Sequence, residues 1–146
     1  MNSASISMGK QFKNNILAIL SLTIAISALG YNSWRNEQSE QNRNIRQAGF
    51  EIIKETAKLQ HFLDNATFIT TKDQSNTPIE GWVRIRLIQS LSMFMNEAVQ
   101  IKANFLLLFW KDNWQNLKLE QNTNNDLSII IDGMVKEVRV ELSQLN

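Results

Sequence analysis

The apolar residues of this chain form one unbroken run near the N-terminus and periodic stripes after it. Ile16 to Leu29 contains no charged residue, and its only polar side chains are three hydroxyls, which can bond to the carbonyls of the helix itself. These 14 residues are fewer than the roughly 20 that cross a bilayer as a helix. The segment reaches 21 residues if it is counted from Asn14 to Trp34. We therefore predict a transmembrane helix at 14–34 after a short tail at 1–13.

Residues suited to the lipid–water boundary follow this run. Tyr31 and Trp34 carry amphipathic rings, which collect at the level of the lipid headgroups, and Arg35 comes directly after them. We interpret Tyr31, Trp34 and Arg35 as interface anchors.

A cleaved signal peptide is the main alternative to a membrane anchor. The charged start, the length of the apolar run and the small-x-small site Ala28-Leu29-Gly30 all fit such a peptide. The residues after Gly30 do not resemble a mature N-terminus, because the helical pattern continues through Tyr31 and Trp34. We favour the uncleaved anchor over the signal peptide, and both over a buried helix of a soluble domain.

The basic residues give the orientation of the segment. Lys10 and Lys13 precede it and three arginines follow it, so the positive-inside count is nearly balanced. The lysines have no acidic neighbours, whereas Glu37 and Glu40 lie among the arginines. The lysine-bearing tail also resembles the start of an export signal. We predict a cytoplasmic N-terminus and an exported C-terminal domain, which in a bacterium is an inner-membrane protein with its domain in the periplasm.

Small side chains recur along one side of the predicted membrane helix. They stand at spacings of three, four and three: Ala18, Ser21, Ala25 and Ala28. Small residues let two membrane helices approach closely, although many membrane helices contain them without using them. The stripe predicts packing against a second helix, from another copy or from a larger membrane partner.

After Trp34 the chain is first very polar and then periodic. Residues 35–45 lack glycine and proline, so we interpret them as a solvated helical stalk in preference to a disordered linker. An apolar stripe at helical spacing then runs to about residue 66. Its members are Ile45, Ala48, Ile52, Leu59, Phe62 and Ala66. The first long helix is thus expected to end near Ala66.

The clearest break is the polar stretch "TTKDQSNTPIEGW" at residues 70–82. Thr77 as N-cap, Pro78 as first helical residue and Glu80 in the first turn form a capping box. The second helix is indicated by Trp82, Ile85, Leu87, Ile88, Leu91 and Phe94. It thus begins at Pro78.

Two more helices are predicted after a corner. We place the corner in "MFMNEAVQ", residues 93–100, because a single helix to Gln121 is too long for this domain. The third helix is indicated by Ile101, Phe105, Leu108, Trp110 and Leu117, and a loop follows at 120–126. The last stripe is Leu127, Ile131, Met134, Val138, Leu142 and Leu145. The fold class is all-α: an antiparallel up-down bundle at 35–146, of four helices or, without the corner, of three.

Composition agrees with one helical domain and narrows its chemistry. The 146 residues include one proline and five glycines, few for a chain rich in strands and turns. Cysteine is absent, which excludes disulfides and thiolate sites. Residues 32–146 hold 13 Lys/Arg and 14 Asp/Glu, a net charge of −1, so we expect no nucleic-acid partner.

No residue pattern indicates catalysis. His61 is the only histidine, which excludes a multi-histidine metal site. It is best explained as a partly exposed or hydrogen-bonded residue, in preference to a pH sensor. Glu51 and Glu55 share a helix face with Lys54 and Lys58, as a solvated surface does. We therefore expect no enzyme, no cofactor and no metal.

Two arginines are the best candidates for a polar site. Arg84 and Arg86 lie about 200° apart around a helix, so one of them must point toward the buried side. That arginine either extends its head group to the surface or pairs with an acid inside the bundle. The other possibility is that it marks a site for a small anion or a partner's carboxylate. Trp110 and Trp114, four positions apart, are read as packing residues in preference to an aromatic ligand box.

The stretches "ALGYNSWRNE", "NRNIRQAGFEIIKE", "GWVRIRLIQSLS" and "FWKDNW" resemble small proteobacterial single-pass membrane proteins of unassigned function. The resemblance covers most of the chain after Leu29. It implies a membrane-anchored helical domain and supplies no activity. The domain is also similar, more weakly, to the helical ectodomains of bacterial sensory receptors.

Two functions follow from this sequence. The first is a non-catalytic single-pass membrane protein that presents a helical bundle for contact with other proteins. The second is a ligand-sensing periplasmic module that binds a small anion near Arg84 or Arg86. The expected partners are the lipid bilayer and either another membrane protein or a second copy of the chain.

Overall fold

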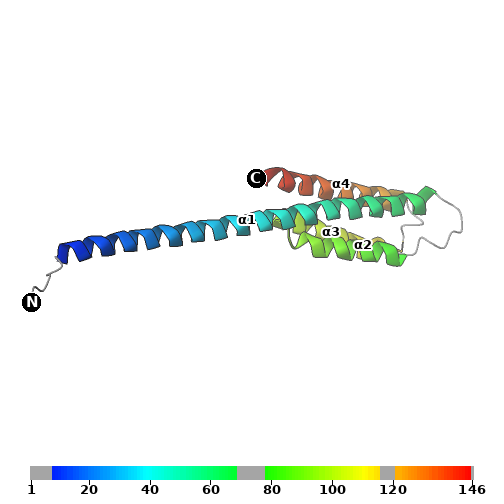
Figure 1. The fold of residues 1–146 in the computed structure, drawn as a ribbon. Helices are drawn as coiled ribbons and strands as arrows, with labels where there is room; N and C mark the ends of the chain where they lie inside the picture. The colour runs from blue at the N-terminus through cyan, green and yellow to red at the C-terminus, as the bar shows by residue number, and fades with distance from the viewer. Residues whose placement is uncertain (1–7, 69–77, 116–120, 146) are drawn as a thin grey trace, which may run out of the picture. The chain divides into compact units, whose positions relative to one another are not determined.

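Helices account for every regular element in the part of the chain that the structure describes. A computed structural model describes residues 8–68, 78–115 and 121–145, and no strand occurs in these ranges. Its helices are α1 (Met8–Phe68), α2 (Pro78–Ser92), α3 (Glu97–Asn113) and α4 (Gln121–Gln144) (Figure 1). The predicted all-α fold class is confirmed.

The chain divides into two compact units between Gln41 and Asn42. In the first unit the described residues are helical, and α1 continues from it into the second. Residues 35–41, which we expected at the start of the domain, belong to the first unit. The second unit holds the rest of α1 together with α2, α3 and α4.

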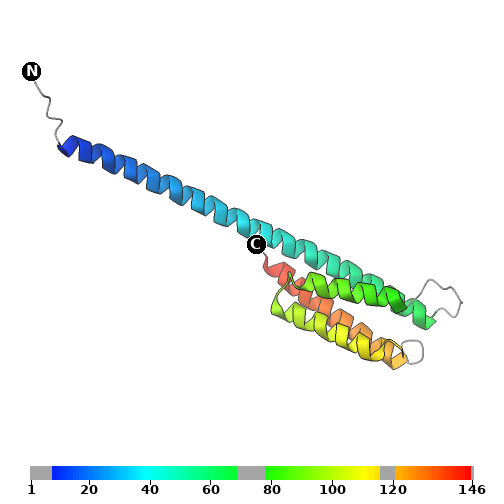
Figure 2. The ribbon, with the colours of Figure 1, turned by 90° about the horizontal axis from the view of Figure 1, so that it is seen from below.

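In the second unit successive helices run in alternating directions (Figures 1 and 2). The helix α3 contacts both α2 and α4. The side chains of α1 reach α2 through an ion pair between Glu55 and Arg84, and α4 through a hydrogen bond of 3.0 Å from Gln60 to Ser128. The antiparallel up-down bundle therefore has four helices, as in the first of our two predicted versions.

The core of the second unit is built by one apolar stripe from each helix and by Met95 between α2 and α3. Its fully or nearly fully buried members are Ala48, Ile52, Leu59, Phe62, Leu63, Ile85, Ile88, Met95, Val99, Ala103, Leu106, Trp110, Leu127, Ile131, Met134 and Val138. Each large side chain among them contributes about 1.5–3 kcal/mol by leaving water. The stripes predicted for α1 and α4 supply half of this core. Ile45, Leu142 and Leu145 are half-buried, and the side chain of Ala66 lies outside the described residues.

The starts of α2 and α3 have different sequence signals. The helix α2 begins at Pro78 as predicted, while the expected cap Thr77 lies outside the described residues. The helix α3 begins after Asn96, whose side chain accepts a hydrogen bond of 3.0 Å from the amide of Val99. The amide of Asn96 itself donates to the carboxylate of Glu141 on α4, at 2.9 and 3.0 Å. The predicted corner therefore exists, and α4 holds it in place.

Two sequence predictions need correction. The expected loop at 120–126 is wrong from Gln121 onward, because α4 already begins there. Thr123 and Asn124 are buried in its first turns, where their polar side chains had suggested a loop. Leu87 and Phe94 were counted in the apolar stripe of the second helix, but both are exposed, and Phe94 lies beyond the end of α2.

The larger difference concerns α3. Three of the residues that indicated this helix, Ile101, Phe105 and Leu108, face outward instead of into the bundle. The core is met by the opposite side of α3, through Val99, Ala103, Leu106 and Trp110. This helix is apolar on two opposite faces, and the second unit covers only one of them.

Candidate functional site

The apolar part of α1 in the first unit is exposed on every side. By length and composition α1 is the one helix in the described ranges that could cross a membrane, and its apolar window is not buried at all. Its large exposed side chains are Ile16, Leu17, Ile19, Leu20, Leu22, Ile24, Ile26 and Leu29. An apolar helix that no other element covers is typical of a membrane span. No described residue buries this window.

Hydroxyl and aromatic side chains of this part of α1 make contacts within the helix itself. The hydroxyl of Thr23 donates to the carbonyl of Ile19 at 2.9 Å, so it needs no partner from water. Tyr31 and Trp34 lie on one side of the helix with their ring centroids 6.1 Å apart, and Arg35 is exposed beside them. The roles of these three residues as interface anchors stay predictions.

The small-residue stripe lies on α1 as the sequence placed it. Its members are Ala18, Ser21, Ala25 and Ala28, all exposed in the helix. Helical spacing keeps them within one side of α1. Their packing against a second helix stays a prediction.

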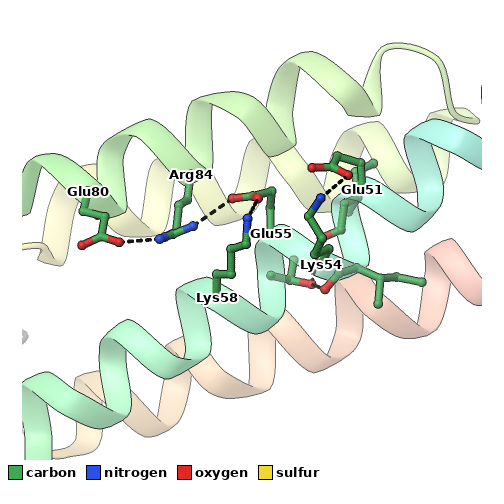
Figure 3. A network of polar contacts seen from close by, with 9 residues as sticks. Glu51, Lys54, Glu55, Lys58, Glu80 and Arg84 are labelled. Carbon is green, nitrogen blue, oxygen red and sulfur yellow. Dashed lines mark hydrogen bonds and ion pairs between the residues drawn. The ribbon is translucent and has the colours of Figure 1, made fainter.

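Arg84 is the centre of a polar network between α1 and α2 (Figure 3). Its guanidinium donates from Nη1 to Glu55 at 3.0 Å and from Nη2 to Glu80, one turn earlier on α2. Lys58 donates to the second oxygen of the Glu55 carboxylate. The side chain of Glu55 is 5% exposed and that of Arg84 19% exposed, so the pair is largely withdrawn from water.

The charges in this network stabilise one another. Burial by itself raises the pKa of Glu55, but hydrogen bonds from Lys58 and Arg84 outweigh it and hold the pKa below its ordinary value. For Arg84, burial by itself lowers the pKa, but the carboxylates of Glu80 and Glu55 outweigh burial and raise the pKa above its ordinary value. Both groups are therefore charged at neutral pH. Arg84 thus adopts the first predicted arrangement, pairing with acids inside the bundle.

The network leaves little positive charge for a ligand. Nη1 donates to Glu55 and Nη2 to Glu80, and these two carboxylates offset the positive charge that would attract a small anion. The Nε–H of Arg84 is buried and has no acceptor among the described residues. Arg86 points the other way and is exposed, with its guanidinium carbon 5.8 Å from the ring centroid of Trp82. The structure does not bring Arg84 and Arg86 together into one site.

The aromatic residues form packing contacts. The ring of Trp110 is completely buried, with centroids 6.1 Å from Phe62 and 6.3 Å from Trp82, the latter edge-on. Its indole N–H has no acceptor among the described residues. Trp114 is only half-buried. The rings fill the space between them, as the packing interpretation expected.

A cavity of about 370 Å³ lies between α1 and the end of α2. Its lining combines two amides and a carboxylate with three apolar residues: Asn44, Gln47, Glu51, Ala48, Leu91 and Phe94. The carboxylate of Glu51 is paired with Lys54 at 2.7 Å. This cavity could not be predicted from local sequence patterns, because Glu51 and Leu91, the nearest lining residues of its two segments, lie 40 positions apart.

The remaining candidates are ordinary surface groups. His61 is exposed and lies 3.1 Å from the side chain of Asn65, one turn along α1. Within the described ranges, no three histidine, aspartate or glutamate side chains gather as metal ligands. No family model, curated protein or solved structure matches this chain.

Proposed function

We propose that this chain is a non-catalytic single-pass membrane protein that holds a helical domain at the membrane for contact with other proteins. The observation that carries the proposal is the uncharged segment of α1 from Ile16 to Leu29, which is exposed on all sides and ends at Tyr31, Trp34 and Arg35. Exposing so much apolar surface to water is strongly unfavourable, whereas a bilayer covers it. In a bacterium the domain would lie in the periplasm, with residues 1–13 in the cytoplasm.

The surface of the bundle supports contact more than chemistry. The outward faces of α2 and α3 are apolar, with Ile79, Val83, Ile101, Phe105 and Leu108 exposed by half or more. Exposed apolar side chains that cluster are typical of interaction surfaces. The charged residues of the Arg84 network, by contrast, are occupied by one another.

Membrane attachment and orientation can be tested on the full chain. We expect the protein to stay in the membrane fraction after an alkaline wash, at full length, and a reporter fused after Asn146 to behave as exported. Replacing Leu20 and Ile24 by arginine should release it, since each charge at the centre of a membrane helix costs about 2.5–3.5 kcal/mol. Recovery of a soluble form that begins near Tyr31 would contradict the anchor and support the signal peptide.

A small-molecule sensor is the second function, and the cavity between α1 and α2 favours it. Its volume falls within the roughly 300–1,000 Å³ of ligand pockets. The amides of Asn44 and Gln47 beside the paired Glu51 suit a neutral polar ligand better than the anion expected from Arg84 and Arg86. For the sensor function we therefore propose a neutral polar ligand in place of the small anion.

A ligand for this cavity should raise the thermal stability of the protein. At one hundred times its Kd a ligand adds about 2.7 kcal/mol, which is about 10–20 °C for a domain of this size. We expect such a shift with a neutral polar compound from a small-molecule library, measured on full-length protein in detergent. The variant Gln47→Trp, which fills the cavity, should lose the shift. Compounds that shift both proteins equally would argue against the cavity as the site.

A further inference from the structure

The uncovered face of α3 has the spacing of a coiled-coil seam. Ala98, Ile101, Phe105 and Leu108 follow one another at three, four and three residues. Ile101 is 59%, Phe105 54% and Leu108 56% exposed, although each is large and apolar. A heptad pattern of this kind forms the contact between two helices that lie side by side. Because the core uses the opposite face of α3, the seam is available to a partner.

The charged residues beside the seam identify the partner as a second copy. With Phe105 in the first core position of a heptad, Glu97 lies on one flank of the seam and Lys102 on the other. In two parallel helices, a residue on the first flank meets the residue five positions later on the partner's second flank. Glu97 of each copy would then meet Lys102 of the other. Neither residue forms an ion pair with another described part of its own chain.

The antiparallel arrangement is less favourable. It would bring the two copies of Lys102 against each other, although it would also pair Glu97 with Lys111. In two copies anchored in one membrane in the same way, the same residue of each copy also lies at the same distance from the bilayer. A parallel seam, in which each residue meets its own counterpart, fits two such copies.

The apolar area of the seam is small, so pairing depends on both copies being anchored in the same membrane. Three large apolar side chains that are exposed by about half bring on the order of 300 Å² per copy. A stable complex in solution usually needs about 800 Å² per partner. Anchoring in a bilayer raises the local concentration of the chain and so makes a small interface sufficient. We propose that α3 pairs in parallel with α3 of a second copy in the membrane, an inference that rests on the proposed single-pass anchoring.

Cysteine crosslinking tests this pairing in membranes that contain the full chain. The protein has no cysteine, so each introduced thiol reports on one position. Leu108 is exposed, so a cysteine introduced there (Leu108→Cys) should form a disulfide with the same cysteine of a second copy and give a covalent dimer. Ile129→Cys, on the outward face of α4 and 68% exposed, should remain monomeric. An antiparallel pair would instead crosslink only in a mixture of Leu108→Cys and Ala98→Cys, and that result would overturn the parallel seam.

Charge exchange tests the specificity of the contact. In the Leu108→Cys background, Lys102→Glu should reduce the crosslinked fraction about fivefold, because two attractive pairs become repulsive. Adding Glu97→Lys should restore it, since the exchanged charges match again. If Lys102→Glu reduced crosslinking by disturbing the fold of the domain, Glu97→Lys would not restore it. If Lys102→Glu leaves the dimer unchanged while Ser21→Leu with Ala25→Leu removes it, the membrane helix drives the contact and the seam is overturned.

The same samples separate this inference from the proposed function. A protein that stays in the membrane but yields no Leu108→Cys dimer would overturn the α3 seam and leave the single-pass anchor intact. A crosslink from Leu108→Cys to a different polypeptide would likewise contradict the proposal that a second copy of the chain binds the α3 seam. A protein found outside the membrane fraction would overturn the anchor itself, and the seam with it.

Discussion

Replacing Gly81 by alanine should destabilise the protein, although the same change in a helix normally stabilises it. A methyl group at Gly81 would lie 2.2 Å from Cζ2 and 2.3 Å from Cη2 of the Trp110 ring. That ring is completely buried between Phe62 and Trp82, so it has no space into which to move. We expect the free energy of unfolding to fall by about 2 kcal/mol, because overpacking of a core costs about 1–3 kcal/mol.

Gly133 provides the matched control for this change. It lies within α4, and an added methyl group would meet no atom within 4 Å. Gly133→Ala should therefore stabilise the protein by about 1 kcal/mol through helix propensity alone. In thermal unfolding of the full chain in detergent, Gly81→Ala should lower Tm by about 10 °C and Gly133→Ala should raise it by about 5 °C.

A double variant checks the cause. Trp110→Phe removes the ring atoms that the new methyl group would meet. In that background Gly81→Ala should be neutral or slightly stabilising. Equal destabilisation by Gly81→Ala with and without Trp110→Phe would contradict the contact as its cause.

The sequence predicted the number and order of helices because its signals for them are local. Pro78 at the start of α2 and the apolar stripes of α1 and α4 each follow from residues within one or two turns. The start of α3 could have been found in the same way. Asn96 followed by Glu97 is a cap and an acidic first turn, but the surrounding apolar residues concealed it.

The sequence could not show which side of α3 faces the core. That helix has two apolar faces, and periodicity alone does not distinguish them. The larger residues, Ile101, Phe105 and Leu108, face outward, while Ala103 packs inside because α3 lies close to its neighbours there. One acid partner of Arg84 was equally hidden, since Glu55 lies 29 positions away on another helix. Contacts of this kind depend on how the helices pack against one another, which local patterns in one amino-acid sequence do not specify.

Removing Arg84 should be the most damaging change in the polar network. Arg84→Met leaves the nearly buried carboxylate of Glu55 with Lys58 alone, and leaves Glu80 without its partner. Breaking a buried ion pair costs about 3–5 kcal/mol, and the partial exposure of Arg84 reduces this to about 2 kcal/mol. Unfolding of the full chain in detergent at pH 7 should show this loss. Lys54→Met, which breaks the exposed pair with Glu51, should change stability by less than about 0.5 kcal/mol.

The double variant Glu55→Leu with Arg84→Met separates the value of the pair from the cost of breaking it. Two apolar side chains of similar volume need no partner, so the double variant should be more stable than Arg84→Met alone. A double variant as unstable as Arg84→Met would contradict an uncompensated carboxylate as the cause of the loss.

Glu55 should also make stability depend on pH in the acid range. Its pKa in the folded protein lies below the ordinary value of 4.5, so the unfolded chain takes up the proton first as the pH falls. The stabilising contribution of Glu55 is therefore complete above about pH 4.5 and is lost as the pH falls through its folded pKa. Arg84 stays protonated throughout this range and adds no slope. We expect the Tm of Glu55→Gln to be lower than that of the native chain at pH 7 and to approach it toward pH 3. Parallel curves for the two proteins from pH 7 to pH 3 would contradict the lowered pKa of Glu55.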